Sequence, residues 1–340
     1  MPWARPESPV QRPQEPLVER LVTDAVLTRT THGNLAALGR PDRWIRGAVH
    51  TRDGSLVSES QRVCGGGGER YAASDPALLK DLGQQAPGRR LRGTWLYGGH
   101  WMPMFGHFIT ETLTSLWPAT SADGLVFHSW LAPRGEVSAW QQRLVELAGR
   151  QGLDVRVVGT RHAVDRLVVA ERPYVVNGWA RPEAVDVWRM VASGVTSDRS
   201  PDRVYFSRTR HNADAVSRGR PVRSSPQRDR ELDQDFERAG FAVFFPEELS
   251  VDQQIGLAAG GRVIGGNSGS ALHLSAFASH PAYVVEVGDE RAPHEGLRNQ
   301  RVIDAARGHH HAFVPAARRA ADILDELELD LMSPPTKEVR

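Results

Sequence analysis

A histidine and a glutamate four residues apart are the side chains of this sequence best suited to acid–base chemistry. His107 and Glu111 follow a short predicted strand, 94–97, and lie in GHFITETLTSLW, whose apolar residues recur at roughly helical spacing. On a helix, both side chains project from the same face. A histidine whose ring is held by a carboxylate is a competent general base near neutral pH. A solvated pair on an ordinary helix has the same spacing, so spacing alone leaves both interpretations open.

A turn rich in glycine and serine is the second candidate for chemistry. The sequence GGNSGS, residues 265–270, separates a predicted strand from a predicted helix at 270–278. Gly269 lets the backbone approach a ligand closely, Ser268 and Ser270 supply hydroxyl donors, and a helix N-terminus favours phosphate. The sequence contains neither a Walker loop nor a correctly placed GxGxxG fingerprint, which argues against a nicotinamide cofactor. A plain strand–helix turn has a similar composition and stays an alternative.

Charged residues at the ends of two predicted strands can serve the same ligand. Arg208 and Arg210 follow the strand predicted at 204–207, at the carboxyl edge where the 265–270 turn also falls. Arginine forks match phosphate oxygens, so these two can neutralise a leaving diphosphate. Glu286, near the end of a later strand, can accept hydrogen bonds from a ribose or pair with one of the arginines. An exposed basic loop is the plain alternative for the arginines.

The composition is that of a globular protein and excludes several kinds of site and partner. The 340 residues carry 42 basic and 41 acidic side chains, so charge does not favour a nucleic acid or an anionic membrane as partner. The single cysteine, Cys64, excludes an intrachain disulfide and a cysteine-only zinc site. No run of 18 apolar residues is present, and we expect a cytoplasmic protein without a transmembrane segment. The proline-rich residues 1–18 are expected to form a disordered leader.

Strands and helices alternate along most of the sequence, which predicts an α/β fold with largely parallel sheets. Strands are predicted at 21–27, 44–49, 94–97, 124–128, 155–158, 167–170, 204–207, 241–245, 262–265 and 282–287. Further helices are predicted at 137–148, 182–192, 230–239, 251–259, 270–278 and 320–331. The arginine-dense stretch 209–228 is predicted to be a long loop. The triplet His309–His311 is also placed in a loop, without a metal.

Length and a linker-like stretch at 193–203 indicate two domains. We expect an N-terminal α/β domain over 19–195 and a second α/β domain over 196–312. Residues 313–340 are expected to form a C-terminal helix and tail.

Three blocks occur in order along the chain: GHFITETLTSLW, VYFSRTR, and a longer block from Pro246 to Val287. Together they resemble the family 61 glycosyltransferases, which include enzymes of capsular polysaccharide biosynthesis. The first block is similar to the family's Gly-His-Trp-x-x-Glu motif, and the second to a strand that ends in an arginine. The third resembles a helix with glutamine, a His-Gly-Ser-Ala-Leu-Thr-Asn turn and a strand ending in glutamate. The matched positions are His107, Glu111, Arg208, Gln254, Gly269, Ser270, Ala271, Leu272, Phe277 and Glu286.

The sequence departs from the family pattern at several positions. Phe108 replaces the usual Trp, Ser268 the usual His, and Leu274 the usual Asn, and the asparagine expected after the arginine strand has no clear counterpart. A changed turn implies a different donor or a loss of activity. A catalytically inactive glycan- or nucleotide-binding protein of the same fold therefore stays an alternative, as does another α/β enzyme with a phosphate ligand.

The resemblance implies a GT-B-like fold, in which two Rossmann-like domains face a central cleft, with the acceptor bound by 19–195 and the donor by 196–312. It also implies inverting transfer of a sugar from a nucleotide-sugar co-substrate to a glycan or other hydroxyl acceptor, in polysaccharide biosynthesis and without a metal or other cofactor. We expect His107 to be the base and Glu111 to orient it; Glu111 as the base is the alternative assignment. Homo-oligomer formation is left open. The expected donor-binding residues are Arg208, Arg210, Gln254, Ser268, Gly269, Ser270 and Glu286. The expected acceptor-binding residues are His100 and Trp101, for which packing in the interior is an equal alternative.

Overall fold

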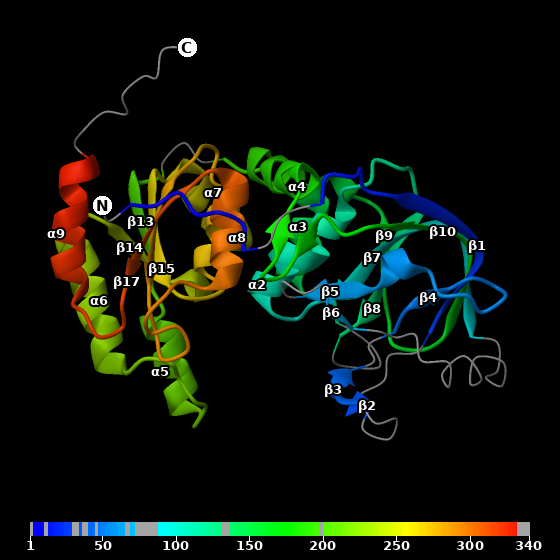
Figure 1. Ribbon diagram of the computed structural model, residues 1–340, viewed down its shortest axis with the longest axis horizontal. Coiled ribbons are helices and arrows are strands. Elements are labelled where there is room, and N and C mark those ends of the chain that lie inside the picture. Colours follow the sequence, from blue (N-terminus) through cyan, green and yellow to red (C-terminus); the bar gives the residue numbers. More distant parts are fainter. Residues whose placement is uncertain are drawn as a thin grey trace, which may run out of the picture. The chain divides into compact units, whose positions relative to one another are not determined.

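The computed structural model describes residues 3–9, 13–28, 34–35, 40–44, 47–64, 69–71, 88–130, 136–196 and 200–331. The chain forms two compact units, an N-terminal unit, Ser8–Val191, and a C-terminal unit, Ala192–Arg340 together with Met1–Glu7 (Figure 1). Each unit has its own sheet and its own hydrophobic core. The predicted α/β class with parallel sheets is confirmed.

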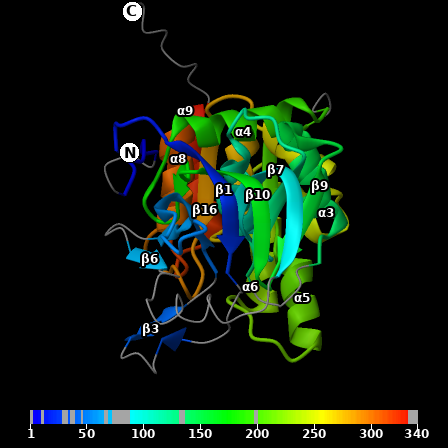
Figure 2. The same ribbon diagram turned by 90° about the vertical axis from the view of Figure 1, so that its right-hand side faces the viewer.

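The N-terminal unit is built on a six-stranded sheet in the order β4-β1-β10-β7-β8-β9. Its strands are β1 (Glu19–Leu27), β4 (Val49–His50), β7 (Arg89–Trp101), β8 (Gly124–Ser129), β9 (Asp154–Val158) and β10 (His162–Ala170). Strands β10, β7, β8 and β9 run parallel, whereas β1 is antiparallel to β10 and β4; Figure 2 shows β1, β10 and β7 side by side. The chain adds β8 and β9 on one side of β7 and β10 on the other. The carboxyl ends of β7 and β10 therefore form a topological switch point, where open α/β sheets bind ligands.

Helical segments connect these strands. After β7, α2 (Phe105–His107) continues into the π-helix η3 (Phe108–Thr112) and the 3₁₀-helix η4 (Thr114–Leu116). After β8, α3 (Ala139–Val145) continues into the π-helical turn η5 (Glu146–Arg150), and the last helix is α4 (Pro182–Ser193). The smaller elements are β2 (Asn34–Leu35), β3 (Arg40–Trp44), η2 (Ser58–Ser60), β5 (Arg62–Cys64), β6 (Glu69–Tyr71), β11 (Tyr174–Val175) and β12 (Trp179–Ala180). Part of the strand predicted at 44–49 lies outside the described residues.

The C-terminal unit contains a five-stranded, fully parallel sheet in the order β14-β13-β15-β16-β17. Its strands are β13 (Arg203–Phe206), β14 (Ala242–Phe244), β15 (Val263–Asn267), β16 (Tyr283–Val287) and β17 (His310–Val314). Its helices are α5 (Thr209–Ser217), α6 (Pro226–Arg238), η6 (Pro246–Glu248), α7 (Val251–Gly260), η7 (Leu272–Phe277), α8 (Arg298–Arg307) and α9 (Ala320–Leu331). Helices α6 and α9 cover one face of the sheet, and α7 and α8 the other (Figure 1). The helix predicted at 320–331 is confirmed as α9.

The prediction of a long loop over 209–228 is wrong. Helix α5 occupies the first part and buries Asn212 and Ala215, which lie three residues apart on one face. Helix α6 begins at Pro226, because the Ser225 hydroxyl accepts a hydrogen bond from the amide three residues on and proline fits the first helical turn. The arginine-rich composition leaves these helices with too few apolar residues for their periodicity to be visible in the sequence.

Two further predictions in this unit are wrong, and one helix was missed. The histidine triplet lies at and within β17 rather than in a loop, because residues from His310 onward pair with β16; His309 and His311 are buried. The helix predicted at 270–278 is a six-residue 3₁₀-helix, η7, and every one of its side chains is buried. Helix α8 was not predicted. No helix in the described parts of the chain is long and apolar enough to cross a membrane.

Two residues near the start of the chain contact the sheet of the C-terminal unit. Ala4 and His311 exchange two backbone hydrogen bonds, of 2.9 and 2.8 Å. The Trp3 ring packs edge-on against Tyr283, with 4.8 Å between ring centroids. These contacts attach the leader to β17 and β16 of the C-terminal unit.

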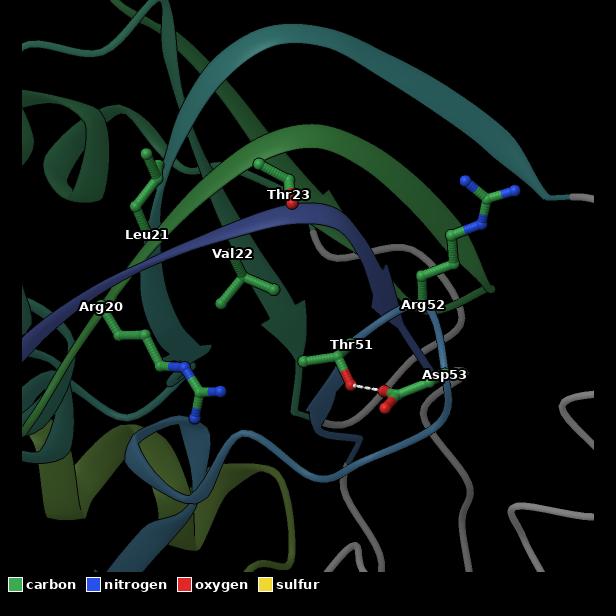
Figure 3. Close-up of a pocket in the computed structure, with 7 residues that line it drawn as sticks. All are labelled: Arg20, Leu21, Val22, Thr23, Thr51, Arg52 and Asp53. Carbon is green, nitrogen blue, oxygen red and sulfur yellow. Dashed lines mark hydrogen bonds between the residues drawn. The ribbon is translucent and has the colours of Figure 1, made fainter.

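A surface pocket of about 610 Å³ lies where β1 and the turn after β4 diverge (Figure 3). It is lined by Arg20, Leu21, Val22, Thr23, Thr51, Arg52 and Asp53. The Thr51 hydroxyl donates to the Asp53 carboxylate within the turn. None of the site residues predicted from the sequence lines this pocket.

Candidate active site

The histidine–glutamate pair lies on a helical segment that departs from a regular α-helix. In η3 the amide of Leu113 donates to the carbonyl of Phe108, five residues back, at 2.8 Å. The Thr110 hydroxyl donates to the Gly106 carbonyl at 2.8 Å and so supplies an additional hydrogen bond to the altered backbone. Single π-helical turns are rare and are often found at functional sites. The local backbone therefore marks this segment independently of its side chains.

Two buried contacts fix the segment against its neighbours. The Thr112 hydroxyl donates to the carbonyl of His100 at 2.8 Å and accepts the amide of Met102 at 3.2 Å, which ties η3 to the end of β7. The indole N–H of Trp188, on α4, donates to the carbonyl of Ile109 at 2.9 Å. The side chains on η3 are thus held by a rigid backbone.

His107 and Glu111 are hydrogen-bonded, with 2.6 Å between Nδ1 of the imidazole and Oε1 of the carboxylate. The Glu111 side chain is 2% exposed, whereas that of His107 is 38% exposed. Because Nδ1 faces the buried carboxylate, Nε2 is the ring nitrogen left for a substrate hydroxyl. A buried carboxylate that orients an accessible imidazole is an arrangement suited to general-base catalysis.

Arg62, at the start of β5, completes this cluster. Its Nε lies 2.5 Å from Oε2 of Glu111 and its Nη2 lies 2.9 Å from Oε1, so the guanidinium binds both carboxylate oxygens. The Arg62 side chain is 6% exposed, and the ion pair is buried. Burial by itself raises the pKa of Glu111, but the Arg62 charge and the hydrogen bonds from His107 and Arg62 outweigh it and lower that pKa to about 2. Glu111 is therefore ionised at neutral pH.

The two predicted acceptor residues lie inside the N-terminal unit. Trp101 is 3% exposed and packs edge-on against Phe108 and Phe127, with centroid distances of 5.0 and 4.8 Å, so it is a core residue. The His100 ring is also buried and contacts the edge of Trp130 at 5.5 Å. Of the two alternatives that the sequence left open for Trp101, these contacts favour packing in the interior.

Arginines gather beside Gly269 in the C-terminal unit, at the carboxyl edge of the sheet. Arg208 follows β13, and a side chain at Gly269 would begin 3.2 Å from its Nη1 and 3.9 Å from Nη2 of Arg291. Arg291 also donates to the Ser268 carbonyl at 3.3 Å. Gly269 has a φ of +151°, which side chains rarely adopt, so the close approach of the guanidiniums depends on glycine here.

The three arginines of this cluster (Arg208, Arg223 and Arg291) lie close enough to influence one another's charge. Burial lowers the pKa of Arg208 and of Arg291, and the nearby Arg223 lowers both further, while Asp289 acts in the opposite direction. Within the described residues, no ion pair involves any of the three arginines. Guanidiniums held together without a carboxylate partner favour the binding of an anion.

Other predicted donor residues have partners of their own. Arg210 forms an ion pair with Glu248 and lies over the Phe245 ring, with its Cζ 4.1 Å from the ring centroid. The Gln254 amide donates to two backbone carbonyls in the loop before its helix, at 2.9 and 3.2 Å. These contacts assign both side chains to holding the local structure. Ser270 is exposed next to Gly269 and stays available to a ligand.

Glu286 and Ser268 are fully buried, so neither can contact a ribose in this structure. Oε1 of Glu286 accepts the amide of Leu297 at 3.0 Å, and its Oε2 lies 3.5 Å from Nε2 of His311. Burial raises the pKa of Glu286, with His311 acting in the opposite direction. Glu286 therefore anchors the segment that follows Arg291. No group of three or more His, Cys, Asp and Glu side chains in the described chain is arranged to hold a metal ion.

Arg62, Arg223 and Arg291 were missed by the sequence analysis. Arg291 follows β16 at the same sheet edge as Arg208, so the argument used for Arg208 also selects it. Arg223 lies in the connection between α5 and α6, within the arginine-dense stretch 209–228. Arg62 is 49 residues from Glu111 and belongs to no recognisable motif, so no sequence signal identifies it.

The model of the family "Glycosyltransferase 61" matches residues 105–285, more than half of the chain. The match includes His107 and Glu111 in the N-terminal unit and Arg208 and Gly269 in the C-terminal unit. No curated protein shows significant similarity to the chain. On the extent of the family match, the chain belongs to glycosyltransferase family 61.

Proposed function

We propose that this protein is an inverting, metal-independent glycosyltransferase that moves a sugar from a nucleotide-sugar to a hydroxyl group of a glycan or another acceptor. The observation that carries the proposal is the accessible imidazole of His107, bound to the buried Glu111 within the segment that the family model matches. Inverting transfer needs a base for the acceptor hydroxyl and positive charge for the leaving diphosphate. Each unit offers one of these. The family resemblance supports a role in polysaccharide biosynthesis.

In this mechanism Nε2 of His107 takes the proton of the acceptor hydroxyl as its oxygen attacks the anomeric carbon. The bond from that carbon to the diphosphate oxygen breaks, and the nucleoside diphosphate leaves with the bonding electrons. Attack opposite the leaving group inverts the anomeric configuration. Glu111 is less suited to be the base, because it is buried, bound by Arg62 and, with a pKa of about 2, a weak proton acceptor.

The arginine cluster is the proposed site for the diphosphate. Arg208 and Arg291 reach the space beside Gly269, and Arg223 adds a third positive charge. These guanidiniums take the neutralising role that a metal ion has in other transferases. Ser270 and the backbone of Gly269 supply further donor contacts. Transfer requires both clusters to act on one pair of substrates, so we also propose the GT-B-like arrangement that the resemblance implies.

An inactive binding protein is less well supported. The side chains at two departures from the family pattern, Ser268 and Leu274, are both 0% exposed, so neither is available to a ligand in this chain. The groups that the mechanism uses are all present. The departures therefore concern packing around the turn rather than the proposed chemistry.

Turnover of a panel of nucleotide-sugars tests the proposal. We expect release of nucleoside diphosphate that persists in EDTA, and NMR of the sugar product should show the inverted anomeric configuration. His107→Ala should lower the rate by about 10²- to 10⁴-fold, the usual contribution of a general base. The matched control, His280→Ala, changes an exposed histidine and should leave the rate unchanged. Release of phosphate or nucleoside monophosphate would indicate a hydrolase, and a full activity of His107→Ala would overturn the assignment of the base.

A further inference from the structure

We propose that Arg62 is a positioning residue for proton transfer, which fixes the Glu111 carboxylate so that it accepts the Nδ1 proton of His107 and leaves Nε2 as the base. The role rests on the proposed function, because it concerns the same imidazole. It goes beyond that function in assigning a residue outside the segment matched by the family model, 105–285. In this proposal Arg62 acts through Glu111 and not on a substrate.

The geometry of the carboxylate carries this inference. Oε1 of Glu111 is shared between the two neighbours, 2.9 Å from Nη2 of Arg62 and 2.6 Å from Nδ1 of His107. Oε2 binds Nε of Arg62. A planar guanidinium that binds both oxygens fixes the carboxylate plane, which a single point charge does not do. The plane in turn sets the direction from which the imidazole N–H can donate.

Arg62 is itself held in place. Its side chain is 6% exposed, and its Cζ lies 5.1 Å from the centroid of the Trp130 ring, a cation–π contact at the end of β8. Strand β5 fixes the backbone of Arg62 by pairing with β6. The guanidinium therefore keeps one orientation, and it transmits that orientation to Glu111.

The charge of Arg62 decides which tautomer His107 adopts. The charged groups that act on Glu111 are Arg62 and His107. With Arg62 present, Glu111 is ionised and can only accept hydrogen bonds, so the neutral imidazole must carry its proton on Nδ1. Without Arg62, the pKa of the Glu111 carboxyl must rise, because burial raises it and the positive charge that lowers it is gone. Protonation of Glu111 then limits the rate at a higher pH, so the acid limb of the pH–rate profile moves to higher pH.

Nitrogen-15 NMR of histidine-labelled protein tests the proposal without any need for turnover. We expect the Nδ1–H tautomer of His107 in the wild type and in Arg62→Lys, and a changed tautomer population in Arg62→Met. The matched control is Arg150→Met, which removes an arginine that binds the Leu116 carbonyl at the other end of the same helical segment. The control should leave the tautomer unchanged. An unchanged tautomer in Arg62→Met would overturn the proposal even if the protein proved not to be a transferase.

Kinetic measurements on two Arg62 variants distinguish the effect of Arg62 on the orientation of the Glu111 carboxylate from its effect on the ionisation of that carboxylate. Arg62→Met should lower kcat by about 10- to 100-fold, with little change in KM for the donor and with the acid limb moved to higher pH. Arg62→Lys keeps the charge and the fold but loses the two-pronged contact, so we expect an unmoved acid limb and a smaller loss of kcat. If Arg62→Lys kept the kcat of the wild type, the positioning role would be overturned. This test still applies if Arg62→Met fails to fold. Absence of turnover in the wild type would instead reject the proposed function and leave the NMR result standing.

Discussion

The two clusters of the molecule differ in how their arginines are neutralised. In the N-terminal unit, both oxygens of Glu111 bind Arg62, and the pair is buried. In the C-terminal unit, none of the described carboxylates forms an ion pair with the arginine cluster. Arg208 and Arg223 are half-buried and Arg291 is exposed, so their positive charges stay open to an anion from solvent. The comparison indicates that the N-terminal cluster is complete before substrate binds, whereas the C-terminal cluster is completed by its ligand.

Glu111→Gln is expected to have the largest effect, on the free energy of unfolding, because it removes the carboxylate charge that the buried Arg62 guanidinium binds. Removing one partner of a buried ion pair costs about 3–5 kcal/mol of unfolding free energy at neutral pH. The pKa of Glu111 is about 2, against an ordinary value of 4.5, so its ionised form stabilises the fold by about 3 kcal/mol above pH 4.5. That contribution is lost as the pH falls from 4.5 through 2. The difference in unfolding free energy between the wild type and Glu111→Gln should therefore become smaller as the pH falls from 4.5 to 2.

Urea unfolding as a function of pH measures this difference. The control is Glu59→Gln, since Glu59 lies 4.0 Å from Arg20 in a long, partly exposed ion pair, and ion pairs open to solvent are worth about 0–1 kcal/mol. Equal losses in the two variants, or a difference that stays constant down to acid pH, would show that the Arg62–Glu111 pair is not the neutralised cluster described here.

The sequence predicts local features of the fold and of the site well. His107 and Glu111 are four residues apart, so the helical period alone places them in contact, and the structure gives them a hydrogen bond. Helix α7 was predicted at 251–259, and the structure shows a capping box at its start, in which Ser250 and Gln253 exchange two hydrogen bonds. In each case the interacting groups are within one turn of each other along the chain.

Features that depend on the tertiary fold were not predictable in the same way. Arg62 meets Glu111 across 49 residues, and only the packing of β5 on the N-terminal unit brings them together. For Trp101 the sequence left acceptor binding and interior packing as equal alternatives, and only its contacts with Phe108 and Phe127 favour packing. Helix α5 was not predicted, because most of its side chains are polar and its buried face is too narrow to give a hydrophobic period in the sequence. Sequence spacing therefore identified the catalytic candidates but not the residues that hold them.

Arg208→Ala should produce the next largest effect, on ligand binding rather than on stability. Loss of a charge-assisted hydrogen bond should weaken the binding of nucleoside diphosphates by about 10- to 100-fold and leave that of bare nucleosides unchanged. Isothermal titration calorimetry with both ligand types measures the effect. Arg210→Ala is the matched control, because this neighbouring arginine is already neutralised by Glu248. Equal losses for Arg208→Ala and Arg210→Ala would remove the distinction between paired and unpaired arginines.

Gly269→Ala is expected to have the smallest effect and tests whether the arginines need the space beside this glycine. The new methyl group would begin 3.2 Å from Nη1 of Arg208, so the guanidinium must shift, and diphosphate affinity should fall by a few-fold. The φ of +151° adds a backbone cost of about 1 kcal/mol to the folded state. Gly219→Ala separates the steric effect on Arg208 from the backbone cost of a positive φ. Gly219 has a φ of +66° but nothing within 4 Å of the added carbon. Both variants should lose stability in thermal unfolding, and only Gly269→Ala should lose affinity. If Gly269→Ala bound nucleoside diphosphates as well as Gly219→Ala does, the anion would have to lie away from the turn, and the arginine cluster would lose its assignment as the diphosphate site.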